Sequence, residues 1–227
     1  MDRPGAKRGY SRGAGVGALS GGSRIMLRLG VLISGAGTNL QAIIDATVAG
    51  SLQAKVALVI ASRPQAGGLE RARQAGIPTL AMSPAVYDRA AWNVDESISL
   101  ALRREAVDYV VLAGYMRKVL PPLLQTFPNR IVNLHPALLP AFPGAGAIEA
   151  AWQRGVKVTG VTVHFVNEQY DEGPIIAQQA LIIQPEDSLA SLTARIHDLE
   201  HQLLPSTLQL LAEGRVSLQD DGRVSIR

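Results

Sequence analysis

The stretch "IVNLHPALLP" (131–140) places two polar side chains, Asn133 and His135, in an otherwise apolar strand pattern. Residues two apart on a strand point to the same face of a sheet, so both side chains can address one carbonyl oxygen. The amide would polarise that oxygen, and the imidazole would donate or accept a proton. Pro136 and Pro140 end the strand, and the bond before Pro140 is a candidate for the cis form. A lone histidine on an apolar strand is often structural, so these residues alone leave both interpretations open.

A later loop, "NEQYDEGP", supplies a carboxylate that suits the imidazole. A carboxylate such as Asp171 raises the pKa of a neighbouring histidine because it favours the imidazolium. Asp171 is equally suited to a plain turn ahead of Gly173 and Pro174, and spacing does not exclude that role. His164, within "VTVHFV", is the weaker imidazole candidate, and we expect a structural role for it.

A glycine loop in "ISGAGTNLQ" separates an expected strand from an expected helix. A helix N-terminus offers unpaired N–H groups and a positive dipole end, which together attract anions. Gly35 and Gly37 let the backbone approach an anion, while Thr38 and Asn39 add a hydroxyl and an amide. The dinucleotide fingerprint requires a third glycine where Leu40 stands. The loop therefore favours a phosphate site over a nicotinamide site, with a turn needed only for packing as the alternative.

Alternating elements must position these side chains. We expect strands at 28–34, 55–62, 77–82, 108–114 and 130–135, and helices at 38–50, 68–76, 88–106 (capped by Asp88) and 119–126. Apolar strands separated by helices predict an α/β, Rossmann-like, doubly wound and mostly parallel sheet. A late antiparallel β pair, a long C-terminal helix and a final hairpin should follow, at 158–166 and 173–183, at 188–213, and around Asp221-Gly222.

Composition excludes several classes of site. The chain has no cysteine, which rules out disulfides, thiolate metal sites and a cysteine nucleophile and fits a cytoplasmic location. His197 and His201 stand one helical turn apart, but nothing else at metal-ligand spacing accompanies them, so we expect no metal. No apolar run approaches membrane-spanning length.

The net charge of +3 is unevenly distributed. Residues 1–25 carry five basic side chains and one acidic side chain in a glycine-rich stretch, which leaves the rest of the chain with a net charge of −1. A nearly neutral body argues against a nucleic-acid surface and against nucleic-acid partners. We expect residues 1–25 to be a disordered leader and residues 26–227 to form a single domain.

Six stretches in order resemble the glycinamide ribonucleotide formyltransferases: "VLISGAGTNLQAIIDA", "GLERARQAGIP", "VVLAGYMRKVL", "NLHPALLPAFPG", "TGVTVHFVNEQYDEGPIIAQ" and "TARIHDLEHQLLP". The resemblance covers about residues 26–214. Members of that family transfer a formyl group from 10-formyltetrahydrofolate, a consumed cosubstrate, to the primary amine of glycinamide ribonucleotide in purine synthesis. The resemblance implies these two small molecules as partners, no metal, no membrane, and a monomer or homodimer.

The resemblance also implies roles for individual residues. Asn133, His135 and Asp171 match the family's catalytic residues, with Asn133 and protonated His135 stabilising the oxyanion and Asp171 holding the imidazolium. The matching binding residues are Gly37, Thr38 and Asn39 for the phosphate, Glu200 for the ribonucleotide, Arg89 for substrate, and Met116, Arg117, Lys118 and Val119, whose backbone meets the pterin head of the folate.

Two positions depart from the family pattern. Ala36 stands where asparagine is frequent, and Gly146 stands where a histidine is expected. The missing histidine leaves a catalytically impaired protein that binds folate or phosphate as one alternative. The others are members of the same formyltransferase group: a formyltetrahydrofolate hydrolase or the catalytic domain of a methionyl-tRNA formyltransferase. Formyl transfer measured with and without the ribonucleotide distinguishes them.

Overall fold

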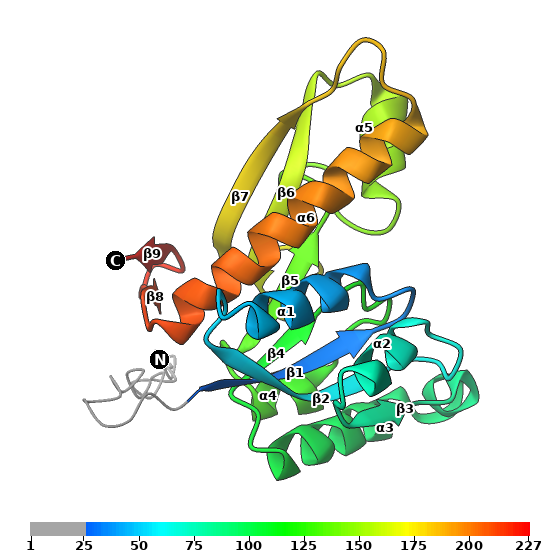
Figure 1. Cartoon of the computed structure of the whole chain (residues 1–227), viewed down its shortest axis with the longest axis vertical. Coiled ribbons are helices and arrows are strands. Elements are labelled where there is room, and N and C mark those ends of the chain that lie inside the picture. The colour runs from blue at the N-terminus through cyan, green and yellow to red at the C-terminus, as the bar shows by residue number, and fades with distance from the viewer. Residues whose placement is uncertain (1–25) are drawn as a thin grey trace, which may run out of the picture.

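The computed structural model describes residues 26–227, apart from the side chains of residues 84–91. The prediction for residues 1–25 lies outside the described residues. One seven-stranded sheet organises the chain in the order β3-β2-β1-β4-β5-β6-β7 (Figure 1). Its strands are β1 (Leu27–Ile33), β2 (Ala54–Ala61), β3 (Thr79–Ala81), β4 (Tyr109–Leu112), β5 (Ile131–His135), β6 (Val158–Phe165) and β7 (Ile175–Ile182).

The first five strands pair in parallel, and β6 and β7 are antiparallel. The mostly parallel, doubly wound prediction with a late antiparallel pair is therefore confirmed. Because the chain steps outward from β1 in both directions, the strand order reverses between β1 and β4. In such sheets, ligands bind beyond the carboxyl ends of the strands at this point of reversal.

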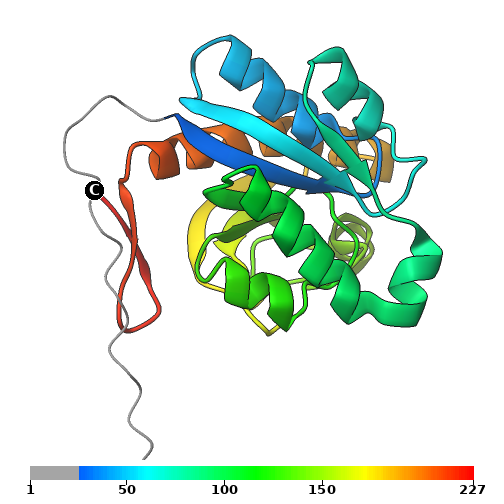
Figure 2. The ribbon, with the colours of Figure 1, turned by 90° about the horizontal axis from the view of Figure 1, so that it is seen from below.

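Helices cover both faces of the sheet (Figure 2). One face packs against α1 (Thr38–Val48), α2 (Gly68–Gln74) and α6 (Leu189–Ala212), and the other against α3 (Pro84–Arg104) and α4 (Pro121–Thr126). The two faces make two cores, because side chains on a strand alternate between them: Val31 belongs to the first core and Leu32 to the second. This alternation explains why the strands are apolar along their whole length.

The long final helix, α6, supports the antiparallel pair. Ser188 caps it through a reciprocal capping box with Ser191, and its apolar stripe, which includes Leu192 and Ile196, is fully buried. A hairpin of β8 (Val216–Leu218) and β9 (Val224–Ile226) follows and projects from the body (Figure 2). Both features were predicted.

Two local predictions need correction. The cap predicted at Asp88 is wrong, because α3 begins at Pro84 with Ser83 in the N-cap position. Proline is well suited to a first helical position, since its missing N–H would have no intrahelical partner there. The helix α5 (Ala147–Arg154) was not predicted, although left-handed glycines, Gly146 and Gly155, flank it.

The Leu139–Pro140 bond is cis, as the sequence suggested. Within residues 26–227, no helix is long and apolar enough to cross a membrane.

Candidate active site

Asn133 and His135 lie on β5, which pairs with β4 and is therefore one strand away from the point where the strand order reverses. Antiparallel pairing with β6 places Asn133 opposite His164 and His135 opposite Thr162. Paired residues on neighbouring strands share a face. The strand register therefore gathers two imidazoles and an amide on one face of the sheet.

His135 and Asp171 form the predicted pair. His135 Nδ1 is 3.4 Å from Asp171 Oδ2, and both side chains are 5% exposed. The other ring nitrogen, Nε2, lies 2.8 Å from the carbonyl oxygen of Phe142. Oxygen acceptors therefore face both ring nitrogens of His135. Asp171 is thus more than a turn residue.

His164 completes the cluster, and the sequence analysis underestimated it. Its Nδ1 lies 2.8 Å from the Phe165 carbonyl, so this nitrogen must be the donor. Burial lowers the pKa of His164, and the neutral ring then offers Nε2 as an acceptor to Asn133 Nδ2 at 3.1 Å. The same amide nitrogen lies 3.4 Å from Asp171 Oδ1. His164 and Asp171 thus orient the Asn133 amide.

The loop that carries Asp171 is held in an unusual conformation. Asp171 itself has a φ of +57°, in the left-handed region that few side chains adopt. Two residues later, a Cβ on Gly173 would lie 1.8 Å from the Phe165 carbonyl oxygen, so only glycine fits there. The Asp171 carboxylate also accepts a hydrogen bond from Gly144 N at 2.8 Å. These constraints fix the carboxylate between β5 and the loop that follows it.

The glycine loop forms a separate polar site at the start of α1. Gly37 is the N-cap residue with φ +74°, and a Cβ there would lie 2.5 Å from the Gly68 backbone. Asn39 Nδ2 donates to Glu200 Oε2 at 3.0 Å, which joins two residues that were predicted separately. Asn39 Oδ1 is buried and has no hydrogen-bond partner among the described residues. Burial raises the pKa of Glu200, against the opposing effects of Asn39 and His197.

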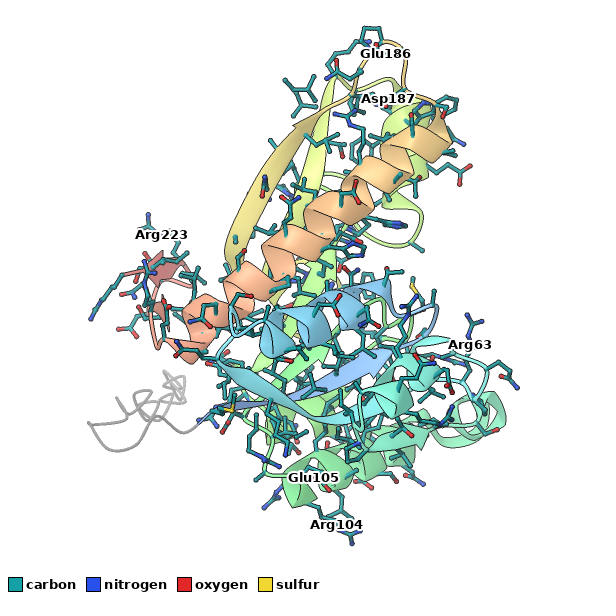
Figure 3. All side chains as sticks on the ribbon, in the orientation of Figure 1. Arg63, Arg104, Glu105, Glu186, Asp187 and Arg223 are labelled. Carbon is teal, nitrogen blue, oxygen red and sulfur yellow. The ribbon has the colours of Figure 1, made fainter. Side chains whose placement is uncertain are left out.

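Two arginines not singled out in the sequence lie against this loop. Arg71 Nε donates to the Ala36 carbonyl at 2.9 Å, and Arg63 Nε donates to the Ser34 carbonyl at 2.6 Å. Figure 3 shows Arg63 beyond the carboxyl end of β1. They add positive charge beside the helix N-terminus, where an anion is already favoured. Their signal in the sequence was weak, because arginines are common on surfaces.

The predicted folate segment borders the catalytic cluster. Arg117, Lys118 and Val119 line a pocket of about 40 Å³ together with Asn133 and Asp171. Met116 is 65% exposed, whereas Val119 is buried. His135 does not line this pocket, although His164 does. Arg89 falls among the side chains outside the described residues.

A larger groove, of about 830 Å³, runs between α1 and α6 beside Thr38. None of the candidate catalytic residues lines this groove. Of the predicted phosphate ligands Gly37, Thr38 and Asn39, only Thr38 lines it. Across residues 26–227, no group of three or more His, Cys, Asp or Glu side chains is arranged to hold a metal ion. Of the two helical histidines, His197 is exposed and His201 is partly buried, with its pKa lowered by burial.

Comparisons with known proteins agree with this geometry. Residues 27–208 match the family model described as formyl transferase. The chain is 42% identical over 186 residues to phosphoribosylglycinamide formyltransferase of Bacillus subtilis, covering 82% of this chain and 95% of that protein. A crystal structure of glycinamide ribonucleotide transformylase 1 from Symbiobacterium toebii superposes with a TM-score of 0.85 at 49% identity, covering 92% of this chain and 98% of that one.

A larger relative matches over part of its length. The trifunctional purine biosynthetic protein adenosine-3 of Homo sapiens is 42% identical over 197 residues, which make up 87% of this chain. The chain spans only 19% of that relative's length. The match therefore concerns one portion of the trifunctional protein.

Proposed function

The chain belongs to the formyl transferase family, and from that premise we propose that it transfers a formyl group from 10-formyltetrahydrofolate to the amine of glycinamide ribonucleotide. The amine attacks the formyl carbon, the carbon's bond to N10 of the folate breaks, and a proton passes from the amine to that nitrogen. The products are formylated ribonucleotide and tetrahydrofolate. One observation carries the proposal: the buried pairing of His135 with Asp171 beside Asn133, at the edge of the sheet where ligands bind.

The pair supplies the acid for the tetrahedral intermediate. Asp171 favours the imidazolium form of His135, which can then donate to the oxyanion. His135 Nε2 must exchange the Phe142 carbonyl for the substrate oxygen, so we propose that loop 136–146 shifts when substrate binds. Phe142 has a φ of +53°, and a left-handed backbone of this kind stores of the order of 1–2 kcal/mol that such a shift would release.

The Asn133 amide must also exchange its present hydrogen bonds before it can polarise the substrate. Its N–H groups face His164 and Asp171, so an N–H must swing toward the formyl oxygen to polarise it. Until then, the side-chain oxygen of Asn133 can accept a hydrogen bond from the attacking amine. This ordering gives Asn133 a role before and during the attack.

The ribonucleotide side is assigned to the glycine loop. The N–H groups at the start of α1, together with Thr38, would bind the phosphate. The unpartnered Asn39 Oδ1 and the Glu200 carboxylate supply acceptors for the ribose hydroxyls. Arg89 remains a predicted substrate ligand, and the backbone from Met116 to Val119 is assigned to the pterin head.

A steady-state assay tests the function directly. Tetrahydrofolate and formylated ribonucleotide should appear in equal amounts and only when glycinamide ribonucleotide is present. Free formate without the ribonucleotide would indicate a hydrolase, and formylation of methionyl-tRNA would indicate the third member of the group. Binding of either ligand without any product would indicate an impaired binding protein.

We also propose that residues 26–227 act as one domain, in the cytoplasm, as a monomer or homodimer. A continuous sheet and two cores shared by distant elements support the single domain. Sedimentation of the purified protein and imaging of a tagged copy in cells test the remaining two points.

A further inference from the structure

The segment from Met116 to Val119 belongs to no helix and no strand. The N–H groups of an irregular segment find their partners outside the regular ladders. Buried side chains from distant parts of the chain supply two partners here, one for Met116 N at the start of the segment and one for Leu120 N, directly after its end.

Ser34, the residue that follows β1, contacts the first end. Met116 N donates to Ser34 Oγ at 2.9 Å, and Ser34 Oγ lies 2.6 Å from Ser62 Oγ. Both serines are 4% exposed. The Ser34 backbone makes two further bonds, from its N–H to the Gly114 carbonyl and to its carbonyl from Arg63 Nε. The N–H, the carbonyl and the hydroxyl of this one residue are therefore all in use.

The position of Ser34 relates these bonds to the two proposed substrate regions. It lies where the strand order reverses between β1 and β4, and it immediately precedes Gly35, the first residue of the phosphate loop (Figure 1). Its hydroxyl therefore lies between the two proposed substrate regions and, of these two, bonds to the segment on the folate side.

Asp95, on α3, contacts the second end. Leu120 N donates to Asp95 Oδ2 at 2.7 Å, and Asp95 is 2% exposed. Burial raises the pKa of Asp95 to about 6, and the Leu120 N–H opposes that rise. The carboxyl group is therefore mostly ionised at pH 7, and a carboxylate accepts a stronger hydrogen bond than a neutral amide.

We propose that Ser34 and Asp95 are positioning residues for the folate cosubstrate: they hold the two ends of the Met116–Val119 segment so that its backbone presents a fixed edge to the pterin head. This inference rests on the proposed function. Neither side chain is assigned a contact with the reacting atoms. Substituting either residue should therefore weaken folate binding rather than slow the chemical step.

Kinetics of Ser34→Ala and Ser62→Ala provide the matched comparison. Each removes one hydroxyl of the same buried pair, but only Ser34→Ala removes the acceptor of Met116 N. We expect Ser34→Ala to raise the KM for 10-formyltetrahydrofolate roughly three- to tenfold, the loss typical of one hydrogen bond. The KM for the ribonucleotide should stay within about twofold, and Ser62→Ala should leave both KM values within about twofold.

The second comparison uses Asp95→Ala, Asp95→Asn and Ser99→Ala. Ser99 is equally buried and lies one turn further along α3, so Ser99→Ala controls for generic damage to this region. Asp95→Ala should raise the folate KM roughly three- to tenfold, and Asp95→Asn should recover most of that loss because the amide oxygen still accepts from Leu120 N. If Asp95→Ala does not fold, the folate KM of Asp95→Asn is compared with that of Ser34→Ala. The Asp95→Asn variant must then show the smaller increase in folate KM.

The outcomes separate this inference from the proposed function. No turnover by the unaltered protein would refute the function. Normal turnover with an unchanged folate KM in Ser34→Ala and Asp95→Ala would overturn the positioning role alone. Equal changes in Ser34→Ala and Ser62→Ala, or in both substrates' KM values, would reduce the effect to general loss of packing and would also overturn it.

Discussion

The phosphate loop and the buried cluster on β5 lie at the same edge of the sheet but are built differently. We propose that the loop binds phosphate through its backbone, at a left-handed glycine and a helix N-terminus. The cluster is a side-chain site, in which His135 pairs with Asp171 while His164 and Asp171 face the Asn133 amide. A backbone site should therefore lose binding gradually when one side chain is removed, whereas a side-chain cluster should lose its function as a unit.

The largest expected effect comes from His135 and Asp171. His135→Ala should lower kcat by about 10²–10⁴, the usual loss for a positioned acid. Asp171→Asn should also be slow because it removes the charge that favours the imidazolium. The double variant should be little worse than the worse single variant, since residues that act as a unit give non-additive losses. Pre-steady-state rates for the three variants measure this, and losses that multiply would show that the two residues act independently.

A substitution in the glycine loop should weaken the binding of the ribonucleotide. Asn39→Ala removes the donor to Glu200 and leaves that carboxylate buried without this partner. Ribonucleotide binding should weaken by roughly 1.5–3 kcal/mol, with folate binding nearly unchanged. Titration calorimetry with each ligand is the measurement. Thr47→Ala, at the far end of the same helix, is the control, and a fall in folate affinity for Asn39→Ala would contradict the assignment of the loop.

Asp95 tests whether a buried carboxylate outside the cluster lowers stability. Its folded-state pKa of about 6 lies above the ordinary 3.8, so the folded protein binds this proton more tightly than the unfolded chain does. That contribution is fully present below pH 3.8 and is lost as pH rises through about 6. The shift corresponds to an upper limit of about 3 kcal/mol.

Replacing Asp95 removes this loss. At pH 7.5, Asp95→Asn should raise the free energy of unfolding by roughly 1–2 kcal/mol, or Tm by about 2–8 °C. The gain should shrink as pH falls from 6 to 4. Calorimetric melting across that range checks the sign, and a variant that is less stable at pH 7.5 would mean that the charge contributes more than its burial costs.

The smallest effect is expected at Gly146. A Cβ there meets open space, but the residue has φ +74° at the N-cap of α5, where a side chain is strained by about 1 kcal/mol. Gly146→His should change kcat by less than about tenfold, because the chemistry needs only one imidazole. A much larger gain in a turnover assay would show that loop 136–146, like the cluster, acts through its side chains. It would also show that the natural chain is impaired.

This contrast also explains what the sequence could predict. Gly37 and the helix after it are adjacent in the chain, so the loop was recognisable from local pattern. His164 appeared structural because its importance depends on pairing with Asn133 across two strands, which no local pattern reveals. The start of α3 was misplaced because Asp88 is as plausible a cap as Ser83, although Pro84 suits the first helical position. Spacing alone likewise could not place Ser34 against Met116.

The bond between Asn39 and Glu200 joins residues 161 positions apart. A ribosome that adds about 5–20 residues per second needs roughly 8–30 s to synthesise the intervening chain. During that interval the phosphate loop has emerged without its carboxylate partner. The bond between Asn39 and Glu200 therefore cannot contribute to folding until synthesis is nearly complete, after the five parallel strands have been synthesised.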